Sequence, residues 1–169
     1  MNLLIIDLKT LNFPRVGLRK ILSTSEYKSV EVLEFNYVVY DMCNNKIISE
    51  GSNGTTPIFE FLENEYSNIM TDIFAIVGHN IDAIVKILYN KCSKIIEHNP
   101  VDVGFICTMR TGGRIFGTSN AYTTIGKLCE LLGVQHVPGR NTFNCLLKIF
   151  RMMDEHNVLL KYEKIKLVS

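Results

Sequence analysis

Asp7 and Lys9 are the residues near the start of the chain whose types and spacing could support chemistry. They stand two apart in an apolar run, and side chains two apart on a strand point to the same face of a sheet. A carboxylate without a cation is costly to bury, so we expect the Lys9 ammonium to act as the counter-ion of Asp7. The alternative is that Lys9 extends into water from the strand end, where ion pairs contribute little.

The stretch 110–114, Arg-Thr-Gly-Gly-Arg, is a second candidate site. Two arginines that flank paired glycines can present guanidinium groups and backbone N–H donors to phosphate. We take Lys9, Arg110, Arg114 and Arg140 as candidate nucleic-acid-binding residues. Further charge or base stacking could come from Arg15, Arg19, Lys20, Phe13 and Phe116. The alternative, which we favour for 110–114, is a flexible connection between a strand and a helix.

Four other polar residues lie at predicted element ends. Asn80 is expected to cap the helix that follows it, and His79 beside it to be structural. Asp82 is expected to be a first-turn acid that the helix dipole favours. His136 precedes Val-Pro-Gly and is interpreted as a turn or surface residue.

Apolar runs and helical spacing alternate along the chain, and the elements they predict must position these candidates. Runs rich in β-formers predict strands, the first of them buried on both faces. Apolar residues at helical spacing predict amphipathic helices. The predicted strands are 2–8, 30–40, 46–50, 73–77 and 101–108, and the predicted helices are 57–66, 81–92, 122–132 and 143–150. This order predicts an α/β fold: a mixed central sheet with an N-terminal hairpin and helices on both faces.

The composition is that of one ordinary globular domain over residues 1–169, with 47% hydrophobic residues. A formal charge of +1 gives no overall attraction to polyanions, so nucleic-acid contacts would depend on a local patch. The five cysteines form no C-x-x-C pair and indicate neither a disulfide framework nor a zinc site. Asp7 interrupts the opening apolar segment early, and no apolar run reaches about eighteen residues. We expect an intracellular protein, cytoplasmic or nuclear, that is not secreted and has no membrane partner.

Short segments spread over nearly the whole chain resemble the DEDDh 3′-5′ exonuclease family of the ribonuclease H-like fold. In order, they are 4–10 (LIIDLKT), 33–39 (LEFNYVV), 78–88 (GHNIDAIVKIL), 107–109 (CTM), 124–134 (TIGKLCELLGV) and 136–141 (HVPGRN). The resemblance implies the exonuclease variant of the ribonuclease H-like fold for the single domain.

The resemblance also implies an active site in which four carboxylates hold two metal ions and a histidine acts as the general base. The acid positions correspond to Asp7, Lys9, Ile84 and Asn141, and the histidine to His136. Only the first of these positions keeps an acid, since lysine brings a cation, isoleucine no donor and asparagine a neutral carbonyl. We therefore expect these relict positions not to be catalytic, and expect no metal ion.

The function that follows is that of a catalytically inactive exonuclease-fold protein. We expect it to act as a binding or scaffold module for a protein partner, for a second copy of itself, or for single-stranded nucleic acid. No cofactor is expected. The alternative is an active metal-dependent 3′-5′ exonuclease with rearranged ligands, which would use Mg²⁺ or Mn²⁺.

Overall fold

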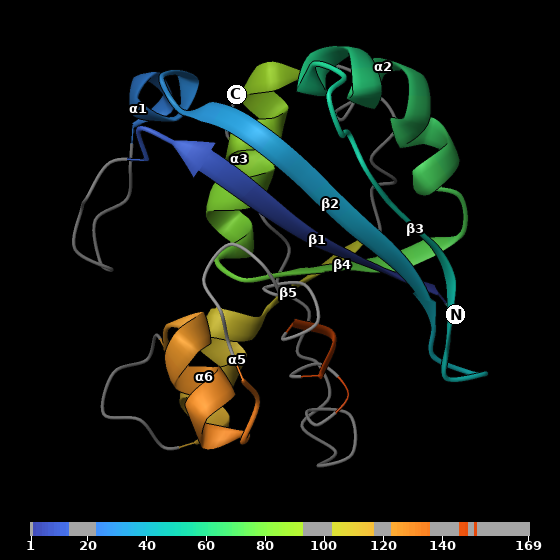
Figure 1. Cartoon of the computed structure of the whole chain (residues 1–169), viewed down its shortest axis with the longest axis vertical. Helices are drawn as coiled ribbons and strands as arrows, with labels where there is room; N and C mark the ends of the chain where they lie inside the picture. The colour runs from blue at the N-terminus through green and yellow to red at the C-terminus, as the bar shows by residue number, and fades with distance from the viewer. Residues whose placement is uncertain are drawn as a thin grey trace.

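A mixed five-stranded sheet with the order β3-β2-β1-β4-β5 forms the centre of the molecule (Figure 1). The computed structural model describes residues 2–13, 23–92, 103–116, 123–135, 146–148 and 151. The strands are β1 (Asn2–Leu11), β2 (Glu31–Asp41), β3 (Lys46–Ser52), β4 (Ile73–Gly78) and β5 (Gly104–Cys107). The first three strands are antiparallel, while β4 and β5 run parallel to β1. The predicted fold class is confirmed.

One face of the sheet is covered by α2 (Ile58–Ile69) and α3 (Ile81–Lys91). Even-numbered residues of β1 point to this face, and Leu4 and Ile6 pack there with Phe35. Both helices bury an apolar stripe against the strands, as their spacing predicts. The helix α2 begins after Pro57 without a side-chain cap.

The opposite face of the sheet is buried by a different part of the chain. Leu3 and Ile5 of β1 pack there with Leu146 and Leu147, which belong to a helical segment. Leu146 is fully buried. The predicted helix 143–150 is therefore confirmed over residues 146–148, the part that the structure describes.

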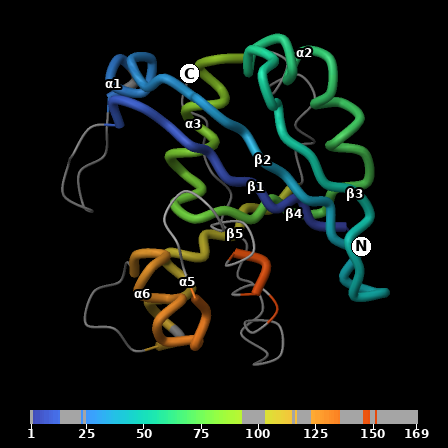
Figure 2. Tube along the Cα trace, in the orientation of Figure 1, coloured from blue at the N-terminus to red at the C-terminus, as the bar shows by residue number. Residues whose placement is uncertain are grey.

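The described residues also form three short helices: α1 (Thr24–Lys28), α5 (Thr108–Ile115) and α6 (Ile125–Leu131). The sequence predicts α6 and misses the other two. A capping box formed by Ser23 and Glu26 begins α1. The helices α5 and α6 lie side by side beyond the end of β5 (Figure 2). Within the described part of the chain, no helix combines the length and apolar character needed to cross a membrane.

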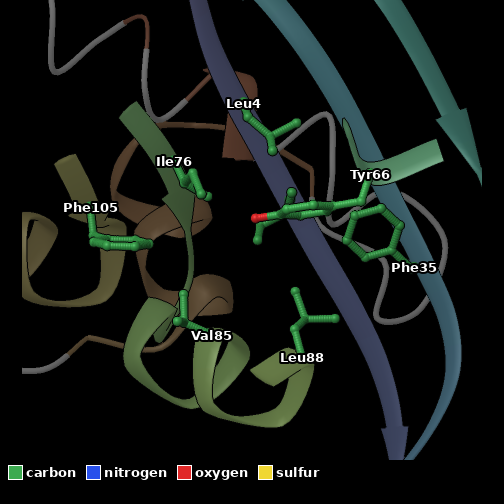
Figure 3. Close-up of a pocket in the computed structure, with 8 residues that line it drawn as sticks. Leu4, Phe35, Tyr66, Ile76, Val85, Leu88 and Phe105 are labelled. Carbon is green, nitrogen blue, oxygen red and sulfur yellow. The ribbon is translucent and has the colours of Figure 1, made fainter. Parts of the chain in front are cut away.

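A small void of about 10 Å³ lies between the sheet and its helical cover. Its walls are apolar side chains, and the Tyr66 hydroxyl points in among them (Figure 3). Burial raises the pKa of Tyr66 above its ordinary value. The space is that of about one water molecule, so this void is a packing feature and not a ligand site.

Candidate ligand-binding cleft

A cleft opens where β4 ends and β1 continues. The last residue pair between these strands is Ile5 with Val77, so the edge of β1 has no neighbouring strand from Asp7 onward. The first turns of α3 form the opposite wall. The cleft has a volume of about 200 Å³ and is lined by Asp7, Leu8, Thr10, Phe13, His79, Asn80, Ala83, Ile84 and Ile87.

Close packing fixes the wall of the cleft at the junction of β4 and α3. A Cβ atom built on Gly78 would lie 2.9 Å from the Ile81 Cδ1 atom and 3.1 Å from that of Ile84. Thr108, at the junction of β5 and α5, is fully buried, and its hydroxyl donates to the Gly78 carbonyl at 3.3 Å. The same hydroxyl oxygen lies 3.1 Å from His79 Nδ1. The predicted structural role of His79 agrees with this contact.

Asp7 carries the one carboxylate among the residues that line the cleft. Burial raises the pKa of this carboxyl above its ordinary value of 3.8. A hydrogen bond from the Leu8 backbone N–H acts in the opposite direction, and the charge of Glu34 adds to the increase. Asp7 therefore sits in a partly desolvated position that disfavours its own charge.

Lys9 does not act as the counter-ion of Asp7, contrary to the sequence-based expectation. Its side chain is exposed, it does not line the cleft, and no ion pair joins it to Asp7, although both residues are described. In the β1–β2 ladder Lys9 lies opposite Glu34, and the register shifts between Lys9 and Thr10. Leu8 and Thr10, which flank Lys9 in sequence, line the cleft.

Asn80 precedes α3 in the left-handed conformation, with φ 61° and ψ 50°. Its side chain makes no capping hydrogen bond, so the predicted capping role is wrong. Its backbone carbonyl instead accepts from Ala83 and Ile84. Asparagine tolerates this conformation better than most residues. The carboxamide, which is not needed as a cap, borders the cleft.

Ile84 lines the cleft with hydrocarbon. It is 6% exposed and belongs to the core that α3 shares with the sheet. Ile87 and Ala83 continue this apolar wall, and Phe13, which is 36% exposed, lines the cleft from the end of β1. About half of the lining is therefore apolar.

Arg110 lies in α5 and forms an ion pair with Asp82 of α3 at 2.5 Å. The interpretation of 110–114 as a flexible connection is wrong, because these residues are helical. Asp82 stands in the first turn of α3 as predicted, but its pairing with Arg110 was not foreseen. Neither residue lines the cleft, and Arg114 is exposed on α5. Their proposed contacts with nucleic acid stay predictions.

His136, Arg140 and Asn141 lie outside the described residues. Within the described ranges, no three His, Cys, Asp or Glu side chains lie together as a possible metal site. The cleft residues that sequence reasoning missed are Thr10 as a lining residue and Thr108 as the link between two junctions, whereas Phe13, named above as a possible stacking residue, does line the cleft. The resemblance covers Thr10 and Thr108 through their segments, but it gives them no role.

Solved structures of 3′-exonucleases share the fold of this chain. A full-length 3′-exonuclease matches with a TM-score of 0.69 and 14% identity over 98% of this chain and 64% of that protein. A 3′-exonuclease described in 3′-end specific recognition of a histone mRNA stem-loop matches with a TM-score of 0.70 and 14% identity, covering 98% of this chain and 68% of its own. The cell-death related nuclease CRN-4 matches with a TM-score of 0.61 and 16% identity over 92% of this chain and 64% of its own.

These identities establish the fold alone, and this chain spans about two thirds of the length of the exonucleases it matches. No family model and no curated protein matches the sequence.

Proposed function

We propose that this chain is a degenerate DEDDh-like exonuclease that binds a partner and does not hydrolyse phosphodiester bonds. The observation that carries the proposal is the donor set of the cleft: one carboxylate, Asp7, faces a wall of Ile84 and Ile87. The fold supports the relationship to 3′-exonucleases. The donor set of the cleft, with its single carboxylate, supports the proposed lack of hydrolysis.

The metal pair of the family does not fit these residues. Two-metal hydrolysis needs anionic oxygens that bridge and flank both ions, because hard divalent cations prefer carboxylates and bind poorly where these are absent. Asp7 provides one such group, Ile84 provides none, and the exposed Lys9 brings a positive charge near the same strand. Asn141 can contribute only a neutral carbonyl wherever it lies.

The alternative is an exonuclease whose ligands have been rearranged. It would have to recruit at least two more carboxylates to Asp7 from residues outside the described ranges. His136 could then serve as the general base, as in the family. Nucleic acid could also be bound without hydrolysis, as one of the partner classes of the proposed binding module; the other classes are a protein and a second copy of the chain.

The decisive experiment is digestion of 5′-labelled single-stranded DNA and RNA in Mg²⁺ and in Mn²⁺. We expect no 3′ shortening above the level of the Asp7→Ala variant purified in the same way, because that variant removes the one acid in the cleft. Equal residual rates for the two proteins support the proposal and identify the remaining activity as that of a contaminating nuclease.

Hydrolysis by the parent chain that disappears in Asp7→Ala would contradict the proposal and establish the exonuclease alternative. A matched Glu130→Ala variant guards against a general effect of losing an acid. Glu130 is exposed on α6, away from the cleft, and its partner is Lys127. This control should behave as the parent chain does.

A further inference from the structure

The polar groups that border the cleft determine the sign of the charge on a ligand that the cleft can hold. Asp7 can only accept hydrogen bonds when ionised, and the Thr10 hydroxyl and Asn80 carboxamide can accept as well as donate. In the part of the chain that the structure describes, no lysine or arginine lines the cleft: Lys9 is exposed, and Arg110 is engaged with Asp82. Among the residues that the structure describes, the charge facing the cleft is therefore negative.

Anionic ligands are disfavoured by this arrangement. Without bridging metal ions, a phosphate in the cleft would face the Asp7 carboxylate directly. The amino end of α3 attracts anions with about half an elementary charge, which is less than the full charge of Asp7. Asp82 in the first turn of α3 already complements part of that dipole. The balance of these two effects favours a cation.

Divalent cations are also disfavoured, because one carboxylate with two neutral oxygens is a poor set for an ion that prefers several anionic ligands. The apolar part of the lining adds a second requirement. Around a bare ion, the apolar side chains of the lining would stay in contact with water, whereas hydrocarbon on the ligand would cover them. These side chains are Ala83, Ile84, Ile87 and Phe13. A cleft of about 200 Å³ has room for a short aliphatic stem and its head group.

We propose that the cleft binds a primary ammonium group carried on an aliphatic stem. The ammonium donates to the Asp7 carboxylate and to the oxygens of Thr10 and Asn80, which matches its three N–H donors. The stem lies against Ile84 and Ile87, and the Phe13 ring borders the cation. A lysine side chain of a protein partner and a free alkyl amine share this chemistry. The inference rests on the proposed function, because a bound metal pair would occupy the same carboxylate.

The test is an NMR titration of the whole chain with three ligands that share one stem: n-pentylamine, n-pentanol and pentanoate. We expect saturable shifts of the Thr10, Asn80 and Ile84 amide signals with the amine alone. Asp7→Asn keeps the shape of the side chain and removes its charge, and it should weaken amine binding by about ten- to a hundredfold, the usual contribution of a hydrogen bond to a charged group. Glu130→Gln makes the same chemical change on α6 and should leave the affinity unchanged.

Two further probes identify the source of the ammonium. A lysine-containing peptide that binds, and loses binding when its lysine is Nε-acetylated, assigns the cleft to a protein partner. Binding of pentylamine without binding of the peptide assigns it to a free amine. Either result supports the proposal.

The proposal is overturned if pentanol binds as tightly as pentylamine, if Asp7→Asn binds the amine unchanged, or if pentanoate or inorganic phosphate is preferred. Failure of amine binding in a chain that also lacks nuclease activity refutes this inference and leaves the proposed function in place. Hydrolysis that depends on Asp7 refutes the proposed function instead.

Discussion

The surroundings of two aspartates, Asp7 and Asp41, shift the pKa of the carboxyl group in opposite directions. The cleft raises the pKa of Asp7, mainly through burial. The hairpin turn between β2 and β3 lowers the pKa of Asp41, chiefly through a hydrogen bond from the Asn44 side chain and also through the backbone N–H groups of Cys43 and Asn44. Asp41 thus stabilises the fold in its ionised form, whereas Asp7 does so only while protonated.

Replacement of each aspartate by asparagine should therefore have opposite effects on stability. The stabilising contribution of Asp7 is present below pH 3.8 and is lost as the pH rises through its folded pKa. Asp7→Asn should gain stability relative to the parent over that rise. The contribution of Asp41 is present above pH 3.8 and is lost as the pH falls through its folded pKa, so Asp41→Asn should be less stable at neutral pH and approach the parent in acid.

Urea unfolding from about pH 2 to pH 8, a range that extends below the ordinary carboxyl pKa of 3.8, measures both differences. An Asp7→Asn variant that is less stable than the parent at neutral pH would show that a cation within the protein already compensates Asp7. A destabilised Asp41→Asn variant in the same series shows that the measurement resolves a carboxylate effect.

At the scale of single residues, the sequence predicted that Asp7 borders the site and that Ile84 is buried. It misplaced Lys9, because the alternation of side chains that holds along a regular strand is interrupted at a register shift. The edge of β1 is free beyond Ile5, and its register against β2 shifts at Lys9. Which strand ends first depends on tertiary pairing and cannot be read from local alternation.

The contact between α5 and α6 depends on one glycine. A Cβ atom built on Gly112 would lie 2.4 Å from Leu128 Cδ2 and 3.2 Å from its Cγ, and Leu128 is fully buried. The side chain cannot turn into solvent to relieve this contact, so the two helix backbones can approach only where a Cβ is absent.

Gly112→Ala should destabilise the protein by about 1–3 kcal/mol through overpacking. The gain in helix propensity, roughly 1 kcal/mol, is too small to reverse this cost. Thermal unfolding checks the prediction. In a double-mutant cycle, Leu128→Ala should relieve the clash, so the pair should be at least about 0.5 kcal/mol more stable than the sum of the single effects. Additive effects would show that the helices separate freely.

Among the elements, strands were predicted better than short helices. Apolar runs bounded by polar residues identify buried strands, and all five were found, with β5 shorter than predicted. The helix α5 was missed because paired glycines favour a turn, while here Gly112 serves close packing. The helix α1 was missed although Ser23 and Glu26 have the spacing of a capping box, since only five residues follow.

For the whole molecule, the two faces of the sheet are buried by parts of the chain that are far apart in sequence. The helices α2 and α3 cover one face, and the segment around Leu146 covers the other. The first strand contributes to both cores. Because one sheet holds both layers, we predict that they unfold together as a single domain.

Leu146→Ala tests this prediction, since it removes a fully buried side chain from the second face. It should cost about 2–5 kcal/mol, while Lys148→Ala, at an exposed position two residues on, should stay within about 0.5 kcal/mol of the parent. Tyrosine fluorescence and circular dichroism in urea should give one coincident transition. Separate transitions would divide the chain into two units.

Ile84 links the cleft to the stability of the fold. Its side chain is at once a wall of the cleft and part of the core beneath α3. An aspartate at this position would place an uncompensated charge among hydrocarbon, at a cost of several kcal/mol. A change of this one side chain therefore alters the shape of the cleft and the stability of the whole fold together, so that neither property can vary alone.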